Sequence, residues 1–264
     1  MTRFYACRTC DGGEGIQVQG PTVVDIAIFA VTQRTGSTLV QRLFNANKST
    51  LIWGENGQSL VRFMGMQHQS LTFARASDRF RDSYLTERDE TIDISCMSPG
   101  ADIVRRAVVG SMRSFVNTLY PPLPGMRIGF KEVTHQPVVI DIFSEAFPRA
   151  RTVFIARHPV STWRSVPDSW KQSLERFAGA WARNVRGYSE RGRVLWMEDI
   201  LHNPKVQAEI RDLAEITRDD FDRVLGINVN ATRSKNIKPQ ADLERVMEIC
   251  GNLIPPHIVE QVTF

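Results

Sequence analysis

The sequence lacks any long apolar run. No stretch approaches the roughly 18 residues that a membrane-spanning helix needs. The opening residues, MTRFYACRTCDGGEGIQVQG, also lack the apolar segment of a secretory signal. We therefore expect a cytoplasmic protein without a membrane partner. The 264 residues are 42% hydrophobic and 23% charged, a composition that suits one globular domain.

Cysteine is scarce, with only Cys7, Cys10, Cys96 and Cys250. Cys7 and Cys10 form a C-x-x-C pair, but a structural zinc site needs four ligands and no second pair completes it. A redox motif would follow a strand at the start of a helix, whereas this pair lies in a polar stretch. We favour the interpretation that residues 1–22 are a polar leader with two reduced thiols, and we expect no metal site.

Clusters of basic residues interleaved with aromatic residues are also missing, although the net charge is +4. Nucleic-acid surfaces usually carry such clusters, so we expect no nucleic-acid partner. A modest positive balance suits a small polyanionic ligand equally well.

The most informative stretch that is present runs from Ile26 to Asn45. Residues 26–31 form an apolar run that predicts a buried strand, and residues 33–38 form a turn that contains one glycine. Apolar residues then recur at helical spacing over 39–45. A strand, a tight turn and a helix in this order make an anion site, because the free N–H groups at the helix start point at the ligand.

Four residues of this turn have suitable chemistry for such a site. Gly36 lets the backbone approach closely, Ser37 and Thr38 can donate hydrogen bonds, and Arg34 supplies a cation. The turn matches neither G-x-x-x-x-G-K-[ST] nor G-x-G-x-x-G. Taken alone, it fits an ordinary capped junction equally well.

Further strands are predicted at 49–53, 126–133, 151–156 and 194–197, with helices between them. This alternation predicts a single α/β domain over 23–264, with a mostly parallel central sheet flanked by helices. Ligands of such sheets bind at the carboxyl ends of the strands. The residues that we place at this edge are Arg34, Glu55, Lys131 and Arg157.

Residues 58–118 show no clean strand pattern. Helices are predicted at 59–73 and 103–119, with a charged, irregular segment at 75–100 between them. An insertion of this length is often a lid or an acceptor-binding segment, and plain surface decoration is the alternative.

The second half of the domain has one further anion site. Arg157 ends a strand, and Ser165 lies eight residues on, about two turns into the next helix. A guanidinium and a hydroxyl at this spacing can hold one tetrahedral anion. Asp168 is expected to cap a long helix that runs to Val185. Trp163 and Trp170 are expected to pack in the core or against helices rather than to form a platform for adenine.

These motifs resemble those of sulfotransferases. The turn Arg34-Thr35-Gly36-Ser37-Thr38-Leu39 is similar to their 5′-phosphosulfate loop, and Arg157 with Ser165 is similar to their 3′-phosphate motif. The segment VLWMEDILHNP, residues 194–204, resembles the part that the family writes as Y-E-D-L with a later proline. The resemblance implies a phosphate-loop-like strand, turn and helix that bind the phosphosulfate.

The match is nearest to the tyrosylprotein and bacterial sulfotransferases, which begin this loop with arginine. In that branch a glutamate after the second strand is the catalytic base, and it maps to Glu55. A lysine after the third strand maps to Lys131. A late loop that ends in I-K-P maps to Lys238, with Ser234 just before it.

The resemblance implies the donor 3′-phosphoadenosine 5′-phosphosulfate (PAPS) and the product adenosine 3′,5′-bisphosphate (PAP), with no metal required. Arg34 and Lys131 would stabilise the departing phosphate, and Glu55 would accept the proton of the acceptor. Arg157 and Ser165 would hold the 3′-phosphate. Thr35, Gly36, Ser37 and Thr38 would bind the 5′ end of the donor, while Ser234 and Lys238 would close over it.

Two departures from the family bear on the acceptor. Met197 stands where the family usually has tyrosine. Asn-Gly-Gln follows Glu55, where the tyrosylprotein enzymes carry an arginine that holds an acidic peptide. We therefore expect a small-molecule acceptor, such as a hydroxyl of a secondary metabolite or glycan. A homodimer is left open.

Two other functions compete with this interpretation. A phosphate-loop kinase that uses ATP would carry G-K-[ST] and an aspartate at the end of a strand. A nucleotide-binding module without catalysis would not need Glu55 or Lys131. Taken singly, Glu55 fits a solvated turn residue, and Lys131 fits an edge-strand ion pair with Glu132.

Overall fold

The computed structural model describes residues 23–88, 91, 93–227 and 237–262. The expectations for the leader, residues 1–22, and for Ser234 lie outside the described residues.

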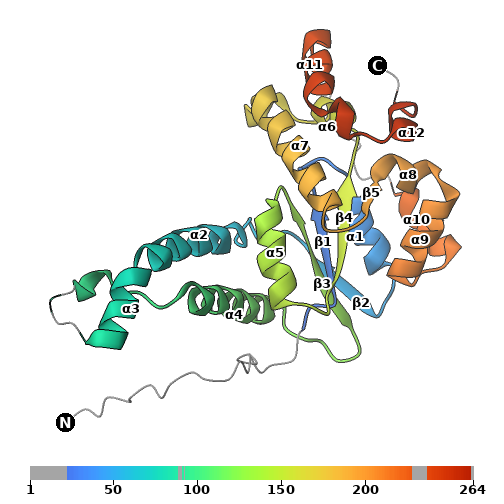
Figure 1. Ribbon diagram of the computed structural model, residues 1–264. Coiled ribbons are helices and arrows are strands. Elements are labelled where there is room, and N and C mark those ends of the chain that lie inside the picture. Colours follow the sequence, from blue (N-terminus) through green and yellow to red (C-terminus); the bar gives the residue numbers. More distant parts are fainter. Residues whose placement is uncertain (1–22, 89–90, 92, 228–236, 263–264) are drawn as a thin grey trace.

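All five predicted strands are present, and they form one parallel sheet. Their order is β2-β3-β1-β4-β5, so the strand that leads into the first turn lies in the middle. Every residue of β1 is buried, as expected for the central strand of a sheet covered on both faces. The predicted α/β fold is therefore confirmed (Figure 1). The strands are β1 (Ile26–Ala30), β2 (Thr50–Trp53), β3 (Arg127–Val133), β4 (Arg151–Ala156) and β5 (Val194–Trp196).

Alternate residues of each strand build two separate cores. Phe29, Phe130 and Phe154 belong to the core on one face, and Ile28 and Ile155 belong to the core on the other. This follows from the two-residue repeat of a strand. The first core is covered by α5 (Pro137–Ala146), α6 (Pro159–Arg164), α7 (Leu174–Ser189) and α11 (Gln240–Cys250). The second is covered by α1 (Ser37–Asn45), α8 (Met197–His202), α9 (Pro204–Ala214) and α10 (Arg218–Leu225) (Figure 1).

A short helix, α12 (Pro256–Val259), lies near the C-terminus, and 3-10 turns occur at Ile94–Cys96, Asp168–Trp170 and Gly251–Leu253. None of the helices in the described ranges has the length and apolar character that a membrane crossing requires.

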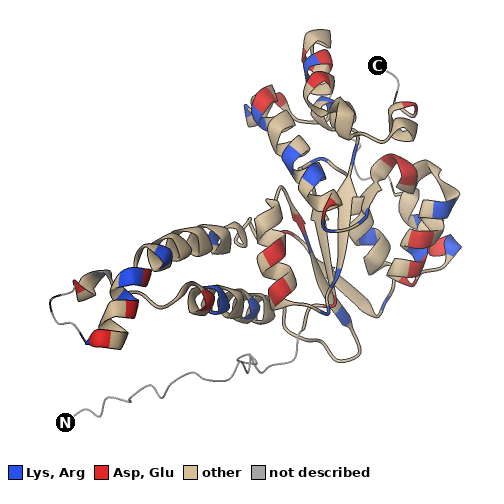
Figure 2. Cartoon of the chain, in the orientation of Figure 1, with Lys and Arg blue, Asp and Glu red and all other residues tan. Residues whose placement is uncertain are grey.

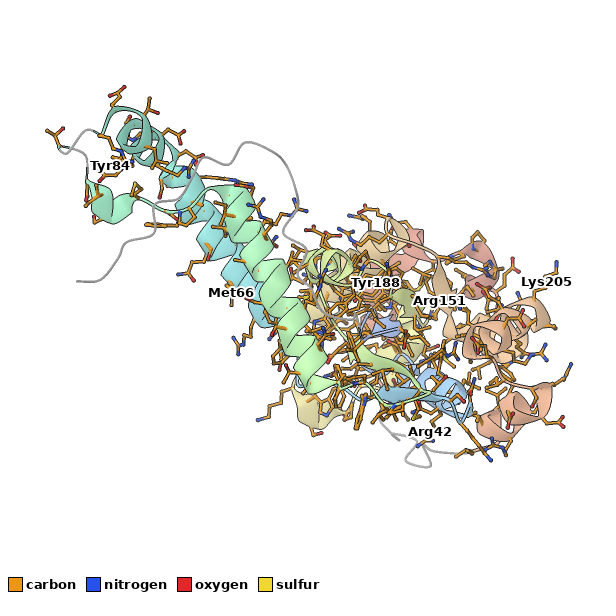
Figure 3. All side chains as sticks on the ribbon, turned by 90° about the horizontal axis from the view of Figure 1, so that it is seen from below. Arg42, Met66, Tyr84, Arg151, Tyr188 and Lys205 are labelled. Atoms are coloured by element: carbon orange, nitrogen blue, oxygen red, sulfur yellow. The ribbon has the colours of Figure 1, made fainter. Side chains whose placement is uncertain are left out.

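The insertion between β2 and β3 is a helical arm. It consists of α2 (Val61–Ala76), α3 (Asp78–Glu87) and α4 (Ala101–Leu119). Figure 1 shows α2 and α4 running side by side away from the sheet, with α3 at the far end. The same projection is visible from below, where Met66 lies along the arm and Tyr84 lies near its tip (Figure 3).

The expectation of an irregular segment at 75–100 is wrong over α3. None of the α3 side chains is buried, so the helix has no apolar stripe that a sequence pattern could reveal. Charge pairs such as Arg81 with Asp78 stand on its surface instead. Charged residues of both signs are interspersed here and on α9 and α10 (Figure 2).

The expected cap at Asp168 is also wrong. Helix α7 begins at Leu174, and the hydroxyl of Ser173 caps it by accepting a hydrogen bond from the N–H of Arg176 at 3.3 Å. Asp168 starts a single 3-10 turn, which ends at Lys171 with a left-handed φ of 46°. The Asp168 carboxylate instead forms an ion pair with Lys238.

Candidate active site

The loops that leave the carboxyl ends of the strands meet around one cleft of about 740 Å³. Because β1 is central, its turn lies between the loops of β2 and β3 on one side and those of β4 and β5 on the other. Six of the predicted site residues line this cleft, namely Arg34, Gly36, Ser37, Thr38, Glu55 and Arg157.

The turn after β1 has the geometry of an anion site. Gly36 is the N-cap of α1 with φ 91°, a left-handed conformation that favours glycine. No acidic residue stands in the first turn of α1. No carboxylate of that turn therefore competes with an anion for its N–H groups and dipole. Met197 closes the back of the turn: a Cβ on Gly36 would lie only 2.6 Å from the Met197 Sδ.

Thr35 differs from its neighbours in the turn. Its side chain is fully buried, and its hydroxyl donates a hydrogen bond to the carbonyl of Thr32. Thr35 is not part of the cleft lining. Its hydroxyl therefore stabilises the turn, and the backbone is the part of Thr35 that is left for a ligand.

The two predicted anion sites are joined by a hydrogen bond. The Arg34 Nε donates to the carbonyl oxygen of Ser165 at 2.9 Å, although the two residues are 131 positions apart. An Arg157 Nη1 lies 3.4 Å from the carbonyl oxygen of Arg34. The Ser165 hydroxyl donates to the carbonyl of Thr162 at 2.7 Å. The structure thus brings Arg34, Arg157 and Ser165 together.

The backbone of Arg157 is hydrogen-bonded to a buried residue of the core. Its carbonyl accepts a hydrogen bond from the Trp181 Nε1 at 3.1 Å. Burial lowers the pKa of Arg157, the nearby carboxylate of Glu198 raises it, and the positive charge of Arg34 lowers it. A half-buried guanidinium beside a second one is a strong site for an anion, because the anion offsets both the desolvation and the repulsion.

Glu198 is a buried carboxylate that the sequence analysis did not single out. Its Oε1 accepts a hydrogen bond from the backbone N–H of His158 at 3.1 Å, which fixes the residue directly after Arg157. Burial raises the pKa of Glu198. The available signal was its place in the segment that resembles Y-E-D-L.

Glu55 and Lys131 form an ion pair. The Lys131 side chain is only 5% exposed, whereas that of Glu55 is 39% exposed and lines the cleft. The alternative in which Lys131 pairs with Glu132 is wrong. β3 is an inner strand, and the Glu132 carboxylate binds the Asn56 N–H and His135.

Lys238 and the two tryptophans lie on the β4 side. Lys238 pairs with Asp168, and its Nζ lies 4.8 Å from the ring centroid of Trp163. Trp163 is buried against Phe177, so its predicted core role is confirmed. Trp170 is 45% exposed and lines the cleft, so it does not pack in the core.

Within the described ranges, no group of three His, Cys, Asp or Glu side chains is placed to hold a metal ion. The charges that line the cleft come from arginine and from Glu55.

A profile of the Sulfotransferase family matches residues 28–209. No curated protein matches the sequence significantly.

The solved structures that the chain resembles include the following three. One is the sulfotransferase domain from the Synechococcus PCC 7002 olefin synthase, with 18% identity and a TM-score of 0.47; the match covers 87% of this chain and 96% of that domain. The sulfotransferase domain from the curacin biosynthetic pathway has 13% identity and a TM-score of 0.45, with coverage of 86% and 98%. Sulfotransferase STF9 from Mycobacterium avium has 15% identity and a TM-score of 0.42, with coverage of 87% and 76%.

Proposed function

The chain belongs to the sulfotransferase family, and from this premise we propose that it moves the sulfuryl group of PAPS to a hydroxyl or amine of a small-molecule acceptor. The observation that carries the proposal is the convergence of Arg34, Arg157 and Glu55 on one cleft, with Lys131 paired to Glu55. The product of the donor is PAP.

The two arginines match a donor with an anion at each end of a nucleoside. Arg34 and the N-terminus of α1 would bind the 5′-phosphosulfate, and Arg157 would bind the 3′-phosphate. The hydrogen bond from Arg34 to the Ser165 carbonyl supports this assignment, because it fixes the spacing between the two sites.

The ion pair supplies the groups for the chemical step. The bond between sulfur and the bridging oxygen of the 5′-phosphate breaks, and a bond from sulfur to the acceptor oxygen or nitrogen forms. Glu55 takes the proton of the acceptor, and Lys131 and Arg34 stabilise the charge that develops on the departing phosphate. Arginine and lysine supply this charge without a metal, so we expect turnover to persist in a chelator.

The arm is our candidate for the acceptor-binding part. It starts immediately after the turn that carries Glu55. A groove of about 460 Å³ lies between α2 and α4, and uncharged side chains line it, including Met66, Phe73 and Val108. This lining suits an apolar, neutral part of an acceptor.

The first test is calorimetric binding of PAP against ATP with Mg²⁺. We expect tight binding of PAP and no binding of ATP, because only PAP places phosphates at both Arg34 and Arg157. Tight binding of ATP with Mg²⁺ in place of PAP would overturn the donor assignment and favour a kinase.

The second test separates an enzyme from a binding module. Glu55→Gln and Lys131→Ala should still bind PAP but should turn over at least about 100-fold more slowly than the wild type. Wild-type turnover in Glu55→Gln would remove this residue from the mechanism.

A further inference from the structure

Directly behind Glu55 lies a second carboxylate that the proposed reaction does not use. Glu132 is fully buried, and so is its neighbour His135. The Glu132 Oε1 accepts a hydrogen bond from the backbone N–H of Asn56 at 2.6 Å. The Glu132 Oε2 lies 3.1 Å from the His135 Nε2. Both oxygens of the carboxylate therefore have partners.

β3 fastens the Glu55 turn at two points. Lys131 and Glu132 are consecutive, so their side chains leave opposite faces of the strand. Lys131 reaches the carboxylate of Glu55, and Glu132 reaches the N–H of Asn56, the next residue of the turn. One end of one strand thus holds both the side chain and the backbone of the candidate base.

His135 connects this attachment to the core. The carbonyl of His135 accepts a hydrogen bond from the Tyr188 hydroxyl at 2.8 Å, and Tyr188 is fully buried in α7. The His135 ring also packs edge-on against Phe29, with 6.0 Å between the ring centroids. A rigid chain of contacts therefore runs from the core through His135 and Glu132 to the turn.

Burying a carboxylate is costly unless it is hydrogen-bonded, and a charged acceptor holds an N–H about twice as strongly as a neutral one. The bond from Asn56 to Glu132 therefore restrains the turn far more than a neutral contact would. The side chain of Glu55 itself is partly exposed, so packing alone does not fix its position.

We propose that Glu132, supported by His135, is a positioning residue that fixes Glu55 for proton acceptance. This inference rests on the proposed function, in which Glu55 is the general base. Glu132 acts through the backbone of Asn56 and does not touch the substrates. Loss of this attachment should slow the chemical step and leave the donor sites intact, because Arg34 and Arg157 stand on other loops.

The experiment compares Glu132→Gln and Glu132→Met with the wild type, measuring kcat, acceptor KM and the Kd of PAP. Glutamine keeps an oxygen for the Asn56 N–H and loses the charge, whereas methionine loses both. We expect kcat to fall about 3- to 10-fold for glutamine and about 30- to 100-fold for methionine. The Kd of PAP should stay within about twofold in both variants.

Asp25→Asn is the matched control. The Asp25 carboxylate also accepts a backbone N–H of β3, that of Ile128 at 2.8 Å, but at the opposite end of the sheet. This variant should keep wild-type kcat and PAP affinity.

Wild-type kcat in Glu132→Met would overturn the proposal, and so would a loss of PAP affinity that parallels the loss of kcat. If Glu132→Met does not fold, Glu132→Gln decides by the same two criteria. Glu55→Gln is measured beside them. If its turnover is normal, the proposed base is wrong; if it is slow while the Glu132 variants are normal, only the positioning role is wrong.

Discussion

The Glu55–Lys131 ion pair can be dissected by a double-mutant cycle of Glu55→Gln, Lys131→Met and the two together. The pair is asymmetric, because the Lys131 side chain is 5% exposed and that of Glu55 is 39% exposed. Each single change therefore leaves a different charge without its partner, and the double change leaves neither.

This asymmetry sets the expected losses in the free energy of unfolding. Stranding a fully buried charge costs about 3–5 kcal/mol, whereas exposed pairs contribute about 0–1 kcal/mol. Glu55→Gln strands the buried Lys131 ammonium, so we expect a loss of about 1–3 kcal/mol. Lys131→Met leaves a carboxylate that reaches water, so we expect about 1 kcal/mol or less. The double variant should be more stable than Glu55→Gln alone.

Activity should behave in the opposite way. Both single variants and the double variant should turn over at least about 100-fold more slowly than the wild type, even though the double variant regains stability. Unfolding in urea, followed by tryptophan fluorescence, measures the stabilities, and a donor-turnover assay measures activity. The exposed pair Arg105–Glu145 is the control, and its coupling should not exceed about 1 kcal/mol. A double variant whose loss of stability relative to the wild type equals the sum of the two single losses would refute the reasoning.

Three further predictions concern the other side of the cleft. Arg157→Ala should weaken PAP binding by about 1.5–3 kcal/mol and leave binding of adenosine 5′-monophosphate nearly unchanged, as calorimetry can show. Burial lowers the pKa of His158 to about 4, so the folded protein should lose up to about 3 kcal/mol of stability as the pH falls from about 6.5 to 4. His158→Asn should reduce this loss in urea unfolding at pH 4.5 and 7. Gly36→Ala should cost about 1–2 kcal/mol and weaken PAP binding, because φ is 91° and Met197 fills the space for a Cβ.

Each of these predictions has a contrary outcome. Equal losses for the two nucleotides in Arg157→Ala would remove the 3′-phosphate assignment. An unchanged acid loss in His158→Asn would place the sensitive group elsewhere. Full recovery of PAP binding in Gly36→Ala combined with Met197→Ala would show that the methionine contact, rather than the left-handed φ, limits the turn.

The sequence indicated the fold because β1, β3 and β4, the three inner strands, are nearly continuous buried runs. The carboxyl ends of parallel strands lie at one edge of the sheet, so the sequence alone could place Glu55 and Lys131 at the same edge. The same reasoning paired Arg34 with Arg157, which both line the cleft.

The role of Glu132 could not be predicted because it depends on strand order. Next to Lys131 in the sequence, it looked like an ion-pair partner. Only the pairing of β2 with β3 brings the Asn56 N–H within 2.6 Å of its carboxylate. Ser173 and Asp168 show the same limit locally, since both residue types cap helices, and the sequence does not tell that Ser173 caps α7 while Asp168 pairs with Lys238.

The order of the strands also places the groups of the proposed reaction on two sides of β1. β1 carries the anion turn in the middle, β4 and β5 carry Arg157 and Glu198 on one side, and β2 and β3 carry Glu55 and Lys131 on the other. A donor with its 3′-phosphate at Arg157 and its 5′ end at the β1 turn must therefore present sulfur toward β2 and β3. β2 is the edge strand from which the chain enters the arm. The acceptor would then approach from the side of the arm, which begins just after the turn that carries Glu55.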